Sequence, residues 1–158
     1  MKKFITLITI ILFTTLIGLC GCAGDYRKTV TSIEAMTLTL QGMRGTSVYE
    51  IAEVDGKTEL RRFRKVYSNG EDILELEASA TCDTKDFIEL MNNCSVIRWD
   101  GFHGEHPKNV NDGIMFDFTA TVNGGQTIYA DGSANYPKGY NEFVRELNKM
   151  LAEREKID

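Results

Sequence analysis

Apolar and polar residues alternate along several short segments of this 158-residue chain, and turn residues separate the segments. Met36, Leu38 and Leu40 alternate with threonines, and the run from Ile114 to Val122 alternates throughout. Because successive side chains of a strand point to opposite faces, a period of two predicts strands with one buried face. Asp55-Gly56 separates two such segments and accepts the positive φ angles of a tight turn. The chain is therefore predicted to fold as successive hairpins.

The strands expected from these patterns fall into two groups. The first group covers 33–40, 48–54, 59–67 and 73–80, and the second covers 114–122 and 127–130. Residues 96–99 are expected to add a short strand, followed by a polar loop over 100–113. The residues of segment 73–80 that are expected to face the core are Leu74, Leu76, Ala78 and Ala80.

Two other segments carry apolar residues at helical spacing. The longer stripe comprises Tyr140, Phe143, Val144, Leu147, Met150 and Leu151, and the shorter comprises Phe87, Leu90 and Met91. Pro137 suits the first turn of the last helix, and Asp83 suits the N-cap of a helix over 84–93. The order β-β-β-β-α-(β)-β-β-α predicts an α+β fold. About six antiparallel strands are expected, with both amphipathic helices on one face of the sheet.

The N-terminus has the parts of a bacterial export signal. Lys2 and Lys3 supply positive charge, and the uncharged run 4–19 is shorter than the roughly 20 residues of a membrane-spanning helix. The segment Leu19-Cys20-Gly21-Cys22 resembles the lipobox of bacterial lipoproteins, with Cys22 as the lipidated residue. The resemblance implies cleavage before Cys22 and a diacylglycerol with palmitate-type chains on its sulfur, which is enough acyl chain for stable membrane attachment.

This signal predicts both the cellular location and the domain organisation. Residues 1–21 are expected to be a signal peptide, residues 22–31 a lipidated tether and residues 32–158 a single α+β domain. The expected location is the extracytoplasmic face of a membrane, at the cell surface or in the periplasm. An unlipidated signal peptide or an uncleaved anchor, the two alternatives, would also place the domain outside the cytoplasm.

The predicted mature chain is acidic. Loss of residues 1–21 removes two lysines and no acids, so the net charge changes from −5 to −7. A negative charge disfavours nucleic acid and anionic lipid as ligands of the protein surface. Four basic residues in one strand are the exception: Arg61, Arg62, Arg64 and Lys65. They are expected to form ion pairs with Glu50, Glu53, Glu75 and Glu77, and a patch for a polyanion is the alternative.

Cys82 and Cys94 remain after processing, in a compartment where disulfides form. A helix over 84–93 would hold them about 15 Å apart, whereas a disulfide needs α-carbons within roughly 7 Å of each other. Two free, buried thiols are therefore expected.

Both histidines of the chain lie between Trp99 and His106. His103, His106 and Glu105 are a candidate metal site, because imidazole and carboxylate are ligands of zinc and similar ions. The spacing His-x-x-His on a loop matches no strong metal motif, so a solvated polar loop is the favoured interpretation. Trp99 and Phe102 are expected to pin this loop to the core, and an aromatic wall against a glycan or peptide is the alternative.

A second candidate segment joins the last strand to the last helix. Candidate ligand-binding residues in the two segments are Trp99, Asp100, Phe102, Asp131, Ser133 and Tyr136. They form one surface if the fold brings 99–113 and 131–136 to the same end. A helix N-terminus can bind an anion, but Ser133 and Asn135 are expected to cap this one instead.

No nucleophile motif and no phosphate-binding glycine loop appears, so enzyme activity is disfavoured and no cofactor is expected. The strings Trp99-Asp100-Gly101-Phe102, Asn111-Asp112-Gly113, Ala130-Asp131-Gly132-Ser133 and Tyr136-Pro137 resemble a pattern of small uncharacterised bacterial proteins, often lipoproteins. That resemblance implies no activity.

The expected function is a membrane-anchored, non-enzymatic binding or cell-envelope domain for an envelope protein, a peptide or a glycan. One alternative is a metal-binding protein or metal-dependent hydrolase that uses His103 and His106. The other is an inhibitor or partner of a secreted enzyme, which would bind by adding a strand to a sheet edge.

Overall fold

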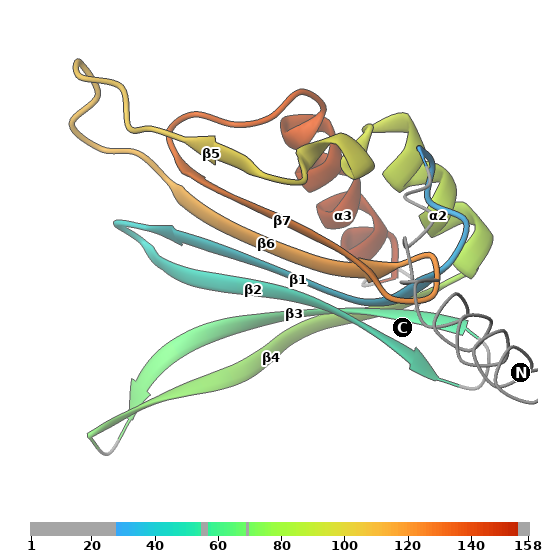
Figure 1. The fold of residues 1–158 in the computed structure, drawn as a ribbon. Coiled ribbons are helices and arrows are strands. Elements are labelled where there is room, and N and C mark those ends of the chain that lie inside the picture. The colour runs from blue at the N-terminus through green and yellow to red at the C-terminus, as the bar shows by residue number, and fades with distance from the viewer. Residues whose placement is uncertain (1–27, 55–56, 69, 155–158) are drawn as a thin grey trace, which may run out of the picture.

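One seven-stranded sheet organises the part of the chain that the structure describes, residues 28–54, 57–68 and 70–154 of a computed structural model. Its strands are β1 (Ile33–Gly42), β2 (Gly45–Val54), β3 (Lys57–Ser68), β4 (Glu71–Cys82), β5 (Phe102–Gly104), β6 (Met115–Val122) and β7 (Gln126–Ser133). They lie in the order β4-β3-β2-β1-β6-β7-β5 (Figure 1), and only β5 and β7 are parallel. The α+β class is confirmed, with seven strands in place of about six. The Asp55-Gly56 turn and the lipobox lie outside the described residues.

Two helices pack on one face of the sheet and leave the other face open (Figure 1). Helix α2 (Thr84–Asn93) begins as predicted, since the Asp83 carboxylate accepts a hydrogen bond from the Lys85 amide at 2.7 Å. Helix α3 (Tyr140–Arg154) begins after Pro137, so the prediction that this proline occupies its first turn is wrong. Between them Gly139, at φ 86°, passes so close to the Cys94 carbonyl that a Cβ there would lie 2.2 Å from its oxygen.

The core lies between the sheet and the helices. The alternation of β6 is confirmed, because its apolar residues from Phe116 to Val122 are buried, although Ile114 precedes the strand and is 50% exposed. Trp99 is central, with its ring 5.1 Å from that of Phe118 and 5.4 Å from that of Phe143 in edge-to-face contacts. Its indole N–H donates to the Lys138 carbonyl, so the expected pinning role holds.

The predicted facing of the fourth strand is wrong for Leu74 and Leu76, which are 49% and 57% exposed. Glu77 has no opposing residue in the register with β3, because the register shifts between Arg62 and Phe63. This extra residue is a β-bulge, and a shift of one residue turns the side chains beyond it to the opposite face. Both leucines therefore lie on the open face of the sheet.

The segment after α2 also differs from the prediction. Val96–Trp99 is a 3-10 helix, η1, and not a strand; its buried residues Val96 and Trp99 are three positions apart, which is one turn of such a helix. The expected polar loop contains β5, which pairs in parallel with Ala130–Gly132. A three-residue strand held by its backbone carries too little side-chain pattern to be recognised in sequence.

Both ends of α2 carry a cysteine, and Cys82 and Cys94 are free as predicted. Cys94 is buried as expected, whereas Cys82 is only partly buried. The packed part of the chain begins earlier than the predicted boundary at residue 32. Val30 is 2% exposed, and its amide and carbonyl both form hydrogen bonds with the Asn92 side chain. The folded domain therefore includes Val30.

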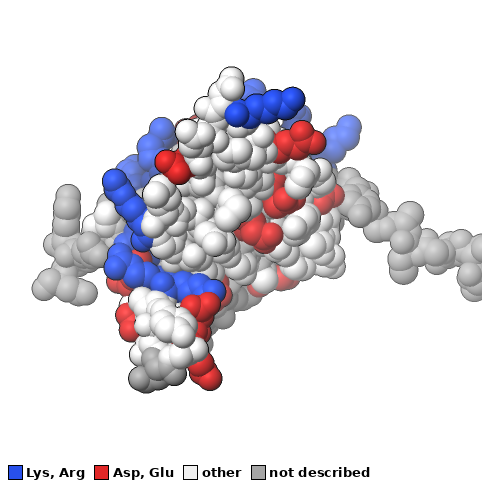
Figure 2. All heavy atoms as spheres, turned by 90° about the vertical axis from the view of Figure 1, so that its left-hand side faces the viewer, with Lys and Arg blue, Asp and Glu red and all other residues white. Residues whose placement is uncertain are grey.

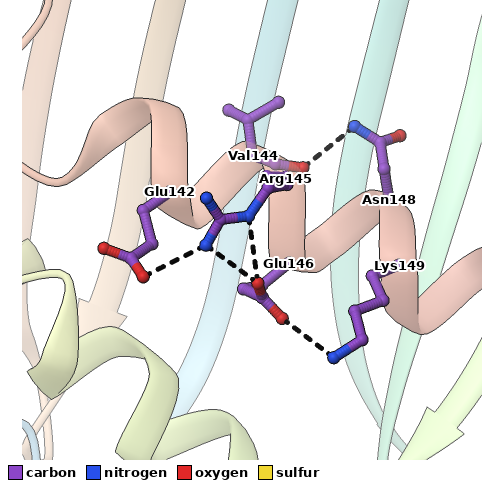
Figure 3. A network of polar contacts seen from close by, with 6 residues as sticks. All are labelled: Glu142, Val144, Arg145, Glu146, Asn148 and Lys149. Carbon is purple, nitrogen blue, oxygen red and sulfur yellow. Dashed lines mark hydrogen bonds and ion pairs between the residues drawn. The ribbon is translucent and has the colours of Figure 1, made fainter.

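Polar contacts run along α3, and Asn148 extends them to the sheet (Figure 3). On its exposed side Arg145 forms ion pairs with two neighbouring glutamates. Asn148 donates to the Val144 carbonyl within the helix. Its own side-chain oxygen accepts hydrogen bonds from the Tyr49 hydroxyl at 2.9 Å and from Arg62 at 3.1 Å. Asn148 therefore joins α3 to β2 and β3.

The basic cluster of β3 is paired with carboxylates, as expected. The pairs are Arg61 with Glu59, Arg62 and Arg64 with Glu77, and Lys65 with Asp72. Glu77 is one of the partners predicted from sequence, whereas Glu59 and Asp72 were not expected. The bulge brings Glu77 within reach of two arginines at once. Since each of these charges has a partner, the alternative of a free basic patch loses its support.

Candidate ligand-binding site

A hollow of about 350 Å³ lies on the open face of the sheet. Strands β1, β6 and β7 form its floor, and β5 with the residues after it forms one wall. The polar side chains that line it are Thr39, Gln41, His103, Glu105, His106, Asp117, Asp131 and Ser133. Met115 adds an apolar surface and is 46% exposed.

Strand register places the central side chains of the hollow in one row. His103 is opposite Asp131, Asp131 is opposite Asp117, and Asp117 is opposite Thr39, across four neighbouring strands. Side chains of directly opposed residues lie on the same face, with Cβ atoms about 5 Å apart. The row therefore runs across the floor of the hollow and reaches its wall at His103.

The two candidate segments meet at this site, as the hypothesis of a shared surface required. His103 Nδ1 lies 2.8 Å from Asp131 Oδ2, and His106 Nδ1 lies 2.8 Å from Ser133 Oγ. Asn135 Nδ2 donates to the Glu105 carbonyl at 3.5 Å. The prediction that Ser133 and Asn135 cap the last helix is wrong, because both side chains hold the 103–106 segment instead.

Glycine permits this close approach. A Cβ at Gly132 would lie 2.6 Å from the Asn135 carbonyl oxygen and 3.0 Å from the Gly104 α-carbon. A Cβ at Gly104 would lie 2.3 Å from the same oxygen. Real side chains do not tolerate such distances, so both positions need glycine for β5 to pair with β7 and form the wall.

The His103 side chain forms an ion pair with Asp131 when it is protonated. Its hydrogen bond with Asp131, together with the negative charges of Asp131 and Glu105, raises the pKa of His103 above the ordinary value of 6.5. The side chain is 70% exposed, so solvent screens this interaction. Protonation of His103 neutralises part of the negative charge that surrounds it.

His106 is held by its neighbours at both ring nitrogens. Its Nε2 lies 2.5 Å from the Val110 carbonyl, which only accepts, so Nε2 carries a proton. Its Nδ1 contacts the Ser133 hydroxyl. Neither nitrogen is free to bind a metal, and the described residues contain no group of three metal-ligating side chains. The geometry therefore gives no support to the candidate metal site of His103, Glu105 and His106.

The other predicted ligand residues lie beside the hollow rather than in it. Trp99 is 1% exposed and belongs to the core. Asp100 accepts a hydrogen bond from the Tyr129 amide at 3.1 Å, which fixes the start of β5 on β7. Phe102 packs on Phe116 from the core side. Of the six predicted residues, only Asp131 and Ser133 line the hollow.

Tyr136, the remaining predicted residue, supports the same segment from behind. Its ring stacks on Tyr140 with centroids 4.5 Å apart, and its hydroxyl donates to the Ile114 carbonyl at 2.9 Å. It therefore braces the approach to β6 and does not line the hollow.

Sequence reasoning missed Thr39, Gln41, Met115 and Asp117, which strands contribute to the floor. The alternating pattern did place Asp117 and Thr39 on the polar faces of their strands. What it lacked was the strand order, which sets β1 beside β6 although some 75 residues separate them in the chain. The signal available in the sequence was Asp117, an acid at the centre of the polar face of its strand.

The hollow is strongly acidic. Glu105, Asp117 and Asp131 line it, and no lysine or arginine of the described chain does so. Tyr129, on the same face, donates to Asp117 Oδ2 at 3.4 Å, and the charges of Asp117 and Asp131 raise the pKa of its hydroxyl. Figure 2 shows acidic side chains gathered over the middle and one side of this end of the molecule, with basic side chains mainly along the opposite side.

No family model, no curated protein and no solved structure matches this chain. Among the residues that the structure describes, no helix is long and apolar enough to span a membrane.

Proposed function

We propose that this protein is a membrane-anchored extracytoplasmic lipoprotein whose domain binds a cationic group of an envelope peptide or protein in the hollow. One observation carries the ligand chemistry: three carboxylates line the hollow, and no described lysine or arginine balances them. A concave surface of one charge raises the local concentration of the opposite charge and selects against like charge. A lysine or arginine side chain, flanked by apolar atoms that cover Met115, fits this lining.

The proposed location rests on the lipobox resemblance around Cys22. A lipid anchor would hold the domain close to other envelope proteins and raise their effective concentration. A shallow and solvent-exposed hollow gives weak affinity by itself, so tethering would make such a site useful.

Binding is favoured over catalysis by the surroundings of the one serine–histidine contact. Ser133 Oγ lies beside His106 Nδ1, but an acyl-transfer site also needs backbone amides that point at the developing oxyanion. The adjacent amide, that of Ala134, already donates to the Ile114 carbonyl. The pair is therefore assigned to holding the loop.

A calorimetric titration with a tri-lysine peptide tests the proposal. The native protein is expected to bind tri-lysine but not tri-glutamate. Asp117→Asn is expected to weaken binding about two- to fivefold, the range of a solvent-exposed charge pair. Glu89→Gln removes an exposed acid of α2, away from the hollow, and serves as the matched control. Equal affinity for both peptides, or equal losses in both variants, would contradict the proposal.

A further inference from the structure

The outer edge of β4 is a second surface, separate from the hollow. β4 is the terminal strand of the sheet, and no described strand pairs with its outer side. Every residue from Glu71 to Glu77 is exposed. An edge strand presents a row of unpaired N–H and C=O groups, to which another extended chain can add.

The usual protections against such pairing are incomplete in β4. Charged side chains (lysine above all), proline and bulges commonly block edge strands, and the acids of this stretch oppose only a strand of like charge. β4 has a bulge at Glu77, but the six residues from Glu71 to Leu76 pair with β3 in regular register. These six residues include no lysine and no proline. Figure 1 shows this end of the β3–β4 hairpin extending beyond the helices, so they do not cover it.

The side chains of this edge alternate in chemistry as well as in direction. Leu74 and Leu76 are about half exposed on the open face. Glu71 and Glu75 lie on the other face, and neither forms an ion pair with a described residue. The acid between them in sequence, Asp72, is different, because Lys65 of β3 already pairs with it. Two unpaired carboxylates and two exposed leucines thus mark the same six-residue stretch.

We propose that this edge binds, by strand addition, an extended basic segment of a partner protein. Basic residues would lie opposite Glu71 and Glu75, and apolar residues would lie opposite Leu74 and Leu76. Opposite charges across two strands stabilise the pairing, and like charges destabilise it. The inner side of β4 already shows this chemistry, since β3 meets its acids with Arg62, Arg64 and Lys65.

Charge argues against a second copy of this chain as the occupant. Two β4 edges side by side would bring together strands that each carry acids at four of their first seven positions. The net charge of −5 adds a repulsion over longer range. A basic partner would avoid both the repulsion between opposed acids and the repulsion between two negatively charged chains.

The test uses the full chain and a synthetic peptide, Val-Arg-Val-Thr-Thr-Arg, whose antiparallel register sets arginines against both glutamates and valines against both leucines. The peptide is expected to bind, and the charge-reversed peptide Val-Glu-Val-Thr-Thr-Glu is expected not to bind. Methylation of the backbone nitrogens on the pairing edge of the peptide should abolish binding, whereas methylation on its other edge should not. That contrast separates strand addition from attraction between charges alone.

Variants of the protein locate the site. Glu71→Gln with Glu75→Gln is expected to weaken peptide binding several-fold. Leu76→Lys is expected to weaken it about tenfold, because a charged side chain replaces the apolar surface opposite a valine of the peptide. Glu89→Gln and Met43→Lys, at an exposed acid and at a methionine that is 86% exposed, are the matched controls and should leave binding unchanged.

Three results would overturn the proposal. The first is equal binding of the two peptides. The second is equal binding of the peptides methylated on the pairing edge and on the other edge. The third is a dimer of the chain that Leu76→Lys dissociates, which would assign the edge to a second copy. Because Asp117 lies on another strand, Asp117→Asn should not alter this peptide's binding, so the outcome is independent of the hollow.

Discussion

His103 is a titratable residue that lines the hollow together with three carboxylates. Its hydrogen bond with Asp131 and the charges of Asp131 and Glu105 raise its pKa above 6.5, so the cation persists to higher pH than in a free imidazole. Below that pKa, His103 adds positive charge and opposes a cationic ligand. Affinity for tri-lysine should therefore rise as the pH is raised through the pKa of His103.

Titrations at several pH values, with the native protein and with His103→Gln, check this sign. The variant should bind more tightly at low pH and should lose most of the pH dependence. A steep rise of affinity with pH that persists in His103→Gln would assign the effect to another group.

Cys94 is a second residue with a defined chemistry. Burial raises the pKa of the Cys94 thiol to about 11, and burial also raises the pKa of Cys82. At pH about 8 the thiolate of Cys94 should be roughly a hundredfold rarer than that of an ordinary cysteine. Alkylation of the native protein should therefore be slow at both residues and complete after unfolding, as peptide mass spectrometry would show. Rapid labelling of native Cys94 would contradict its burial.

Some of the residues that line the hollow could be predicted from the sequence. Sequence reasoning selected His103, Glu105, His106, Asp131 and Ser133, because polar residues clustered in two turn-rich segments. It could not recover Asp117 or Thr39, whose neighbours on the floor come from strands far apart in the chain. Pairing across a sheet is a property of strand order, and local pattern does not contain it.

Among the elements, α3 depends on its buried face rather than on its surface ion pairs. Phe143 is fully buried and contacts the rings of Phe87, Trp99 and Phe118. Phe143→Ala should lower the free energy of unfolding by about 3–5 kcal/mol, as large-to-small core substitutions do. Denaturant unfolding measures this loss.

The matched substitution on the same helix is Glu142→Gln, which removes one partner of Arg145 (Figure 3). Both side chains of that pair are more than half exposed, so the change should stay within about 0.5 kcal/mol. A loss as large as that of Phe143→Ala would mean that surface charges, not packing, hold α3.

The elements themselves were largely predictable, with failures where the backbone overrides side-chain pattern. Alternation predicted β1 and β6, and helical spacing predicted α2 and α3. The bulge at Glu77 reversed Leu74 and Leu76, because one inserted residue exchanges the two faces without any mark in the sequence. Strand β5 was missed because three residues are too few to show an alternating pattern.

For the whole molecule, the lipobox resemblance predicts a defined mass. Intact-protein mass spectrometry of the membrane fraction should show loss of residues 1–21 and addition of a diacylglycerol on Cys22. Cys22→Ser should abolish the adduct and release the chain from membranes, or leave it uncleaved. An unlipidated native chain of full length would contradict the proposed address.

In the whole molecule, the helix-covered face of the sheet forms the core, and the proposed binding site lies on the open face. Residue-resolved amide chemical shifts of the isotope-labelled protein, followed during addition of tri-lysine, test this division most directly. Binding in the hollow should give changes that saturate and centre on residues 103–106, 115–117 and 131–133, which line it. Changes centred on α2 and α3, or no saturable change at all, would contradict it.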